Sequence, residues 1–273
     1  MQIKVAGCSG FCFGVKRAIN IAKKALLKDK PKIYSLGPII HNPQVVEELF
    51  KKGLQVVSSL KGIKNGIVII SSHGAPIEVL EEIKKRKINL IDATCPFVKY
   101  AQNIVRRLKR EGYRIIIMGD KAHPEVKALK SLTLPSPING RGKKIGIVSQ
   151  TTQNKENYIK EIGKILEEDF SEIRIFNTIC NDTLRRQLAT RALLKDCDLI
   201  IVIGGKNSAN TRRLWQICKE SGVGSFHIET ESELKREWFA GKRRVGITSG
   251  ASTPDSMVEN VRERIKKFNK GTL

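Results

Sequence analysis

Three cysteines of this 273-residue chain stand at nearly equal intervals and have the chemistry of metal ligands. Cys12, Cys95 and Cys180 are separated by 83 and 85 residues, and each directly precedes a segment predicted to be helical. The N-terminal end of a helix favours a thiolate over a thiol. Three soft ligands suit an iron-sulfur cluster or a zinc ion. Each cysteine taken singly is better explained as a small core residue, and it is their even spacing that favours a shared site. We interpret Cys197 and Cys218 as core residues.

Three of the four histidines occupy equivalent places in the sequence pattern. His41, His73 and His123 each follow a predicted strand and precede a predicted helix. Ligands of open α/β sheets bind at the carboxyl ends of strands, so we expect these histidines to face one crevice. Glu125 lies in the first turn of the helix after His123, where a carboxylate either stabilises the helix end or relays protons to a substrate.

Three turns rich in hydroxyl groups also open predicted helices. They are residues 149–152, 204–211 and 248–253. Free backbone amides and small hydroxyls at a helix start form a cradle for phosphate, while ordinary N-capping explains any one of the turns alone. The sequence contains neither a Walker motif nor the glycine pattern of a standard dinucleotide fold.

The elements expected around these residues alternate short β-branched runs with amphipathic segments, which is typical of parallel α/β sheets. The predicted strands are 3–6, 33–36, 66–70, 90–92, 114–118, 144–148, 173–177, 199–203, 225–228 and 244–247. Helices are predicted over 15–27, 97–110 and 183–194, and prolines at 43, 76, 96, 124 and 254 mark helix starts. The pattern predicts three units, 1–95, 96–179 and 180–273, with the first strand free to join the third unit.

The composition favours a globular protein and leaves alternative functions open. Apolar residues make up 40% of the chain, enough to bury a core at this length. The net charge of +23 favours nucleic acid or an acidic protein partner, but aromatic residues are only 5% and do not alternate with basic ones. A basic RNA-binding protein is therefore one alternative. A zinc-dependent α/β protein using the three cysteines and a histidine is another.

The same sequence gives expectations about location. No apolar run approaches the roughly 18 residues that a membrane span needs. The first residues lack the layout of a secretory signal, so we expect a cytoplasmic protein with no membrane partner. The six cysteines are too scattered for a disulfide scaffold.

Taken together and in order, the motifs resemble the 4-hydroxy-3-methylbut-2-enyl diphosphate reductase family of the non-mevalonate isoprenoid pathway. The resemblance spans nearly the whole chain. The matching motifs are residues 10–18 (GFCFGVKRA), 41–43 (HNP), 72–74 (SHG), 92–96 (DATCP), 123–126 (HPEV), 150–152 (QTT), 206–210 (KNSAN) and 250–252 (GAS).

The resemblance implies a fold, a cofactor and a reaction. The implied fold is an α/β trefoil of three pseudo-threefold units around a central 4Fe-4S cluster, one per chain, with Cys12, Cys95 and Cys180 as its three protein ligands. Three ligands leave one iron with an open coordination position. The implied reaction is the two-electron reductive dehydroxylation of an allylic diphosphate to isopentenyl and dimethylallyl diphosphate.

The resemblance also implies roles for individual residues. Glu125 is the implied proton donor, with His123 and Thr151 close to the substrate hydroxyl. The residues implied to bind substrate are His41, His73, His123, Thr151, Ser208, Ala209, Asn210 and Ser252. The implied electron donor is a carrier such as ferredoxin or flavodoxin, and we expect a monomer.

Three positions differ from the common sequence pattern of the family. Phe13 follows the first cysteine where a small residue is frequent. Ala209 removes a hydroxyl from the diphosphate site and leaves only its backbone amide. Asn181 and Asp182 replace a small or aromatic pair, and Asp182 adds a negative charge beside Cys180.

Overall fold

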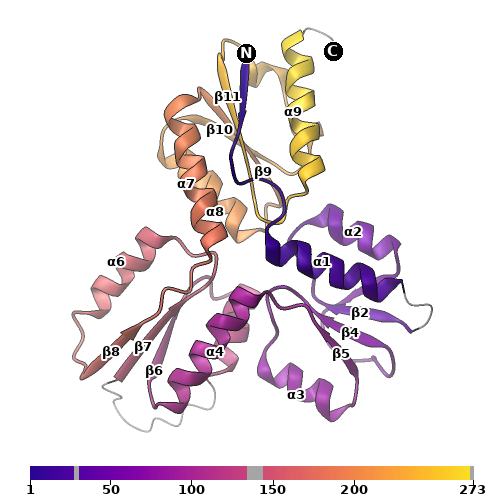
Figure 1. Ribbon diagram of the computed structural model, residues 1–273, viewed down its shortest axis with the longest axis vertical. Helices are drawn as coiled ribbons and strands as arrows, with labels where there is room; N and C mark the ends of the chain where they lie inside the picture. The colour runs from indigo at the N-terminus through magenta and orange to yellow at the C-terminus, as the bar shows by residue number, and fades with distance from the viewer. Residues whose placement is uncertain (28–30, 134–143, 271–273) are drawn as a thin grey trace. The chain divides into compact units, whose positions relative to one another are not determined.

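The computed structural model describes residues 1–27, 31–133 and 144–270. Within these ranges all strand pairs are parallel and form three separate sheets with helices packed against them (Figure 1). The contacts divide the chain into two compact units. The first unit contains residues 1–13, 41–43 and 181–273, and the second contains 14–40 and 44–180. The predicted class, an α/β protein with three parallel sheets, is confirmed.

The first unit contains one four-stranded sheet in the order β1-β11-β9-β10. Its strands are β1 (Gln2–Val5), β9 (Leu199–Ile203), β10 (Gly224–Ile228) and β11 (Arg244–Ser249). Its helices are α7 (Asn181–Asp196), α8 (Ala209–Glu220) and α9 (Asp255–Lys270). Two short 3₁₀ segments, Glu231–Glu233 and Arg236–Phe239, connect β10 to β11.

Strand β9 is buried on both faces because helices cover the sheet from both sides. Alternate side chains of a strand point to opposite faces. Leu199 and Ile201 pack in a cluster with Val261 of α9, whereas Ile200 packs in a second cluster with Leu214 of α8. A continuous run of apolar residues is the expected sequence of such a central parallel strand.

The second unit contains two sheets with the orders β3-β2-β4-β5 and β6-β7-β8. The strands are β2 (Ile33–Leu36), β3 (Leu54–Val57), β4 (Ile67–Ile70), β5 (Asn89–Asp92), β6 (Arg114–Met118), β7 (Lys144–Ser149) and β8 (Glu172–Ile175). The helices are α1 (Phe13–Leu26), α2 (Pro43–Lys51), α3 (Ile77–Lys85), α4 (Pro96–Arg110), α5 (Pro124–Ser131) and α6 (Lys155–Ile165).

Helix α4 packs closely on strand β7 because the strand has a glycine at the contact. A Cβ atom on Gly146 would lie 2.7 Å from a methyl carbon of Leu108. Leu108 and Val105 of α4 are fully buried with Val148 of β7 and Leu129 of α5. This packing fixes the direction of α4, and with it the helix start that follows Cys95.

The predicted elements agree closely with the structure, with one omission. The predicted strands 33–36, 114–118 and 199–203 have the observed bounds, and all five marker prolines lie at or directly before a helix start. Strand β3 was not predicted, because its Leu54–Val57 sequence is short and its residues are only partly buried at the sheet edge. No helix in the described ranges is both long and apolar enough to span a membrane.

Candidate active site

Each of the three candidate ligand cysteines is anchored through its backbone in the same way. The amide of the cysteine donates a hydrogen bond to a carbonyl oxygen in a loop that follows a strand. The pairs are Cys12 to Ala251 at 3.0 Å, Cys95 to Ser72 at 3.0 Å and Cys180 to Thr151 at 2.9 Å. The three acceptor loops follow β11, β4 and β7, so the repeat predicted from cysteine spacing corresponds to a repeated local structure.

The three cysteines share a position at the start of a helix and an intermediate degree of burial. Cys12, Cys95 and Cys180 directly precede α1, α4 and α7, and none of the six cysteines forms a disulfide. Burial raises the pKa of the Cys95 thiol, and the nearby Glu125 adds to this, while the amides of Phe97 and Val98 oppose it. A buried thiolate is unfavourable because its negative charge is uncompensated, and a bound metal ion supplies the opposite charge in place of the proton. The donor set therefore fits a thiolate-bound metal centre.

The loop that carries Cys12 is held by a buried arginine of α7. The guanidinium of Arg186 is 2% exposed and forms an ion pair with Asp182 at 2.6 Å. It also donates to the carbonyl oxygens of Cys8 and Ser249, each at 3.2 Å. The negative charge that Asp182 adds to the sequence is therefore compensated by Arg186, one helical turn away.

Replacing Arg186 with methionine is expected to destabilise the protein by about 3 kcal/mol, because the loss of one partner leaves a charge and two carbonyl oxygens uncompensated. Urea unfolding followed by circular dichroism measures this change. The neighbouring Arg185 is exposed, so Arg185→Met is the matched control and should stay within about 0.5 kcal/mol of the parent. Equal stability of the two variants would contradict a structural role for Arg186.

Glu125 is a buried carboxyl group held by one partner residue. It lies in the first turn of α5 and is 1% exposed. The amide of Thr151 donates to its Oε1 at 2.6 Å, and the Thr151 hydroxyl donates to its Oε2 at 2.8 Å. Burial raises the pKa of Glu125 to about 7, although the hydrogen bonds from Thr151 act to lower it. A carboxyl group with this pKa exchanges protons readily near neutral pH.

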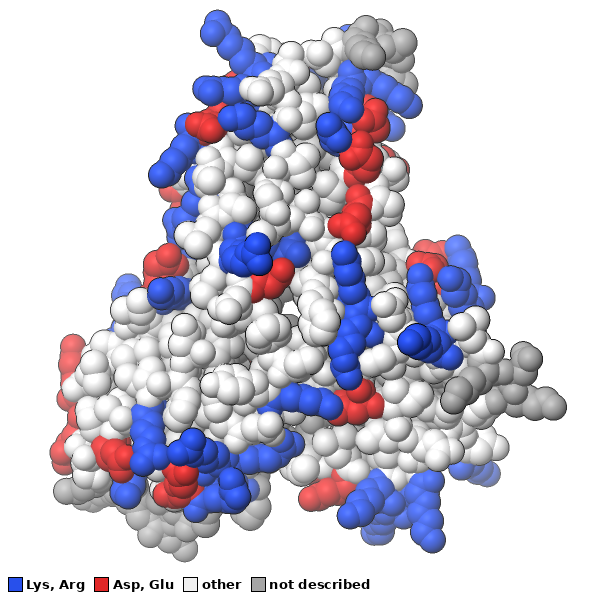
Figure 2. Space-filling view, viewed as in Figure 1, with Lys and Arg blue, Asp and Glu red and all other residues white. Residues whose placement is uncertain are grey.

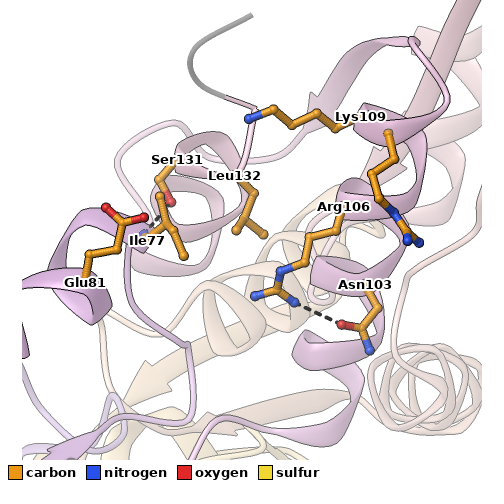
Figure 3. Close-up of a pocket in the computed structure, with 8 residues that line it drawn as sticks. Ile77, Glu81, Asn103, Arg106, Lys109, Ser131 and Leu132 are labelled. Atoms are coloured by element: carbon orange, nitrogen blue, oxygen red, sulfur yellow. Dashed lines mark hydrogen bonds between the residues drawn. The ribbon is translucent and has the colours of Figure 1, made fainter. Parts of the chain in front are cut away.

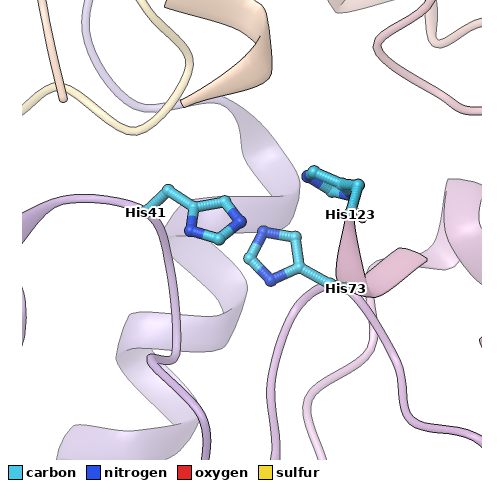
Figure 4. Close-up of side chains that lie close together, drawn as sticks. All are labelled: His41, His73 and His123. Carbon is cyan, nitrogen blue, oxygen red and sulfur yellow. The ribbon is translucent and has the colours of Figure 1, made fainter. Parts of the chain in front are cut away.

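Two histidines of the second unit lie next to one another, and one of them contacts the backbone of Glu125. His123 caps α5, and its Nδ1 accepts the amide of Glu125 at 3.2 Å, which places the proton of a neutral ring on Nε2. The rings of His73 and His123 meet edge to face with centroids 5.3 Å apart (Figure 4). His73 follows Ser72, whose carbonyl oxygen anchors Cys95. Histidine, carboxyl and cysteine groups therefore come from neighbouring loops of one unit.

The first unit has a cradle of small polar groups at the start of α8. The hydroxyl of Ser208 caps the helix by accepting the amide of Thr211 at 3.3 Å. Asn210 is 4% exposed, and neither its Oδ1 nor its Nδ2 has a hydrogen-bond partner in the described part of the chain. A buried amide without partners is costly, so the position fits a polar ligand that supplies them.

His41 is fixed to the same unit by its backbone. The hydroxyl of Ser252 donates to the carbonyl oxygen of His41 at 3.0 Å. A Cβ atom on Gly205 would lie 2.9 Å from that same oxygen, so only glycine permits this approach. Burial lowers the pKa of His41, and the nearby Arg212 lowers it further. The ring is therefore neutral at neutral pH unless an anion binds beside it.

The predicted site residues fall into two groups, one in each unit. The first unit contains Cys12, His41, Ser208, Ala209, Asn210 and Ser252. The second unit contains His73, Cys95, His123, Glu125, Thr151 and Cys180. Sequence reasoning missed Arg186 and also Arg17, whose guanidinium donates to the carbonyl oxygen of Thr94 at 3.0 Å. Arg186 could have been found from its position four residues after Asp182, because this spacing favours an ion pair on a helix.

Comparison with known proteins gives matches along the whole chain. The model of the LytB protein family matches residues 3–266. A 4-hydroxy-3-methylbut-2-enyl diphosphate reductase of Geobacter sulfurreducens is 47% identical and covers 98% of each chain. The enzyme of the same name from Aquifex aeolicus is 43% identical over 100% of this chain and 99% of its own.

Solved structures agree with these sequence matches. A structure of (E)-4-hydroxy-3-methyl-but-2-enyl diphosphate reductase, described as the terminal enzyme of the non-mevalonate pathway, superposes with a TM-score of 0.72 at 43% identity. It covers 98% of this chain and 100% of its own. The corresponding reductase from Plasmodium falciparum gives a TM-score of 0.87 at 29% identity, over 96% and 87% of the two chains. The chain thus belongs to the LytB family of 4-hydroxy-3-methylbut-2-enyl diphosphate reductases.

Proposed function

We propose that the chain acts by a two-electron reductive dehydroxylation of 4-hydroxy-3-methylbut-2-enyl diphosphate. One C–O bond of the allylic alcohol breaks and one C–H bond forms, which consumes two electrons and two protons. The oxygen leaves as water, and the products are isopentenyl and dimethylallyl diphosphate. The observation that carries the proposal is the buried carboxyl group of Glu125, whose pKa burial raises to about 7, in the same unit as Cys95 and Cys180.

We assign Cys12, Cys95 and Cys180 as the ligands of a 4Fe-4S cluster. The repeated backbone anchoring of the three cysteines and their positions at helix starts support this assignment. When bound, such a cluster supplies the electrons and an iron with an open coordination position for the substrate. The carboxylate of Glu125 is not a further ligand in this proposal, because both of its oxygens are engaged by Thr151.

Glu125 and Thr151 form the proton-delivery pair. Burial keeps a large share of Glu125 in the acid form at neutral pH. The Thr151 hydroxyl both donates and accepts hydrogen bonds. It can therefore give its own proton to a substrate oxygen and take the proton of Glu125 in its place, without moving. Its carbonyl oxygen meanwhile holds the amide of Cys180. One residue therefore supports both the acid and the metal ligand.

The diphosphate group is assigned to the cradle of the first unit. Asn210 offers a donor and an acceptor that lack partners in the described residues, and the free amides at the start of α8 favour an anion. Ala209 contributes only its backbone amide. His41, which is neutral without ligand, gains a favourable proton when the diphosphate binds. We also assign His73 to the substrate, with His123 beside the hydroxyl.

The rate is expected to fall as the pH rises through the pKa of Glu125. Only the acid form donates a proton, and above pH about 7 it decreases tenfold per pH unit, so kcat/KM should decrease with it. Well below that pH Glu125 is fully protonated, so its ionisation causes no loss of kcat/KM. The measurement is a pH profile with a chemical reductant. An alkaline limb that persists unchanged in Glu125→Gln would assign the ionisation to another group.

The experiment that tests the function is anaerobic purification followed by iron and sulfide analysis and an assay on the same sample. About four irons and four sulfides per chain, with reductant-driven turnover of the allylic diphosphate, are the expected result. Zinc without iron would overturn the cluster assignment. A full cluster without turnover would overturn the proposed reaction.

A further inference from the structure

Figure 2 shows Lys and Arg side chains spread over the surface, several of them beside Asp or Glu side chains. Several of the ion pairs stay within one helix. The hollow of about 600 Å³ in the second unit is lined in a similar way, since Arg106 bonds to Asn103 of its own helix at 2.9 Å (Figure 3). One ion pair of the first unit instead joins two loops, Lys206 with Glu233 at 3.2 Å. Lys206 belongs to the loop 204–208, which leads into α8 and the proposed diphosphate site.

The end of strand β10 bonds to the same loop at three successive residues. The Nε2 atom of His227, the fourth histidine of the chain, lies 2.8 Å from the carbonyl oxygen of Gly204. The carbonyl oxygen of Ile228 accepts the amide of Gly204 at 2.9 Å. The Oε1 atom of Glu229 accepts the amide of Lys206 at 2.7 Å. A carbonyl oxygen can only accept, so His227 carries its proton on Nε2 and donates it to Gly204.

His227 is itself held by the two elements that flank the loop. It pairs with Val202 in the parallel ladder between β10 and β9. Its ring lies against Trp215 of α8, with centroids 5.6 Å apart. Burial lowers the pKa of His227, so the ring is neutral at neutral pH. Because β9 leads into the loop and α8 follows it, His227 is fixed to both ends of the segment to which it donates.

The carboxylate of Glu233 strengthens the contact at Lys206. Its Oε1 atom accepts the amides of Glu229 at 2.7 Å and Thr230 at 3.0 Å. Its Oε2 atom forms the ion pair with the Lys206 ammonium group. Lys206 is therefore held through its backbone by Glu229 and through its side chain by Glu233.

The loop also contacts residues that are assigned to the diphosphate. Gly204 has a φ of +144°, which favours glycine, and a Cβ atom there would lie 2.7 Å from the hydroxyl of Thr211. The carbonyl oxygen of Gly205 accepts the amide of Ser208 at 2.9 Å. Gly205 also packs closely against the carbonyl oxygen of His41. A shift of the loop would therefore displace both Ser208 and the backbone of His41.

We propose that His227 and Glu229 are positioning residues for the substrate, which hold the loop 204–208 in the shape that binds the diphosphate. The inference rests on the proposed function, which places the diphosphate at the start of α8. Neither residue is among those assigned to touch the substrate, and each acts through a backbone group of the loop. A loop that is already in place loses less conformational entropy when the substrate binds. The two residues therefore lower KM rather than raise kcat.

The test removes each bond and then restores it with a conservative variant. His227→Phe keeps a ring beside Trp215 but lacks the donor to Gly204, and Glu229→Ala lacks the acceptor for the Lys206 amide. With a chemical reductant, we expect each to raise the KM for the allylic diphosphate about tenfold, with kcat within about twofold of the parent. His227→Gln and Glu229→Gln keep a donor and an acceptor, so their KM should stay within about threefold of the parent. Calorimetric titration with inorganic diphosphate should give Kd values in the same order.

Phe226→Leu is the matched control for a general loss of packing. Phe226 directly precedes His227 in β10, and its ring stacks on Trp238 with centroids 3.7 Å apart. The change weakens the packing of β10 without removing a bond to the loop. Urea unfolding should show lower stability, while KM and the Kd for inorganic diphosphate should stay at the parent values. Glu229 is only partly buried, so Glu229→Ala still tests the inference where His227→Phe fails to fold.

The outcomes separate the inference from the proposed function. An equal rise of KM in Phe226→Leu would assign the effect to general loosening of the unit and overturn the inference. Unchanged KM in both His227→Phe and Glu229→Ala would also overturn it, while turnover by the parent leaves the proposed function intact. A parent protein that turns over no allylic diphosphate would overturn the proposed function and the inference with it.

Discussion

Glu125→Gln is expected to lower kcat by about 10²- to 10⁴-fold while substrate affinity stays within a few-fold of the parent. The amide has nearly the same shape and can still bond to Thr151, but it has no acidic proton to deliver. The cluster content should be unchanged, because Glu125 is not a ligand in the proposed site. Single-turnover reduction of the substrate with a chemical reductant, together with iron analysis, measures both quantities.

Thr151→Val and Thr151→Ser complete this test. Valine removes the hydroxyl that donates to Glu125 Oε2 but keeps the backbone amide and carbonyl, so we expect a smaller loss than for Glu125→Gln. Serine keeps the hydroxyl and should retain most of the rate. A Glu125→Gln enzyme with more than a tenth of the parent kcat would move the proton donor to another residue, of which His123 is the nearest candidate by sequence.

Cys180→Ser is expected to lose most of its iron during anaerobic purification. Serine keeps the backbone hydrogen bond to Thr151 but replaces a soft thiolate with a hydroxyl that binds iron poorly. The apoprotein should fold with the parent circular dichroism spectrum, because the sulfur is not part of a disulfide. Iron and sulfide content and the visible absorption of the cluster measure the loss.

Cys8→Ser is the matched control for the cysteine test. Cys8 shares the Cys12 loop and has the same intermediate burial, and its carbonyl oxygen accepts a hydrogen bond from Arg186. The variant should keep about four irons per chain. If Cys8→Ser lost iron as completely as Cys180→Ser, the assignment of exactly three protein ligands would be wrong.

The elements that position the site follow from the sequence wherever one local rule decides the structure. Strand β9 is predicted because five consecutive apolar residues suit a strand buried on both faces. The start of α4 is predicted because Pro96 has no amide to lose at the first helical position. Strand β3 was missed because only its first residue is buried, so its stability comes from pairing with β2 rather than from its own sequence.

The candidate site also contains residues that the local sequence indicates and residues that it does not. The cysteines and histidines can be proposed from the sequence, because their residue types and order alone mark them as candidates. The role of Arg186 depends on two carbonyl oxygens that lie far away in the sequence, at Cys8 and Ser249, and no local pattern reports such bonds. The pairing of Asp182 with Arg186, by contrast, is a local contact four residues apart, which the sequence does indicate.

Each of the three cysteine amides bonds to a carbonyl group, and these carbonyl groups differ in whether they are synthesised before or after their cysteine. Ser72 and Thr151 are synthesised before Cys95 and Cys180, so these two cysteines can be anchored as soon as they emerge. Cys12 must wait for Ala251, just as Gln2 of β1 must wait for its partner Arg244. Since domains generally fold as they are completed, the second unit can form while the first is still open. Cys12 is therefore the last of the three to be set in place, which delays the full set of proposed ligands until nearly all of the chain is made.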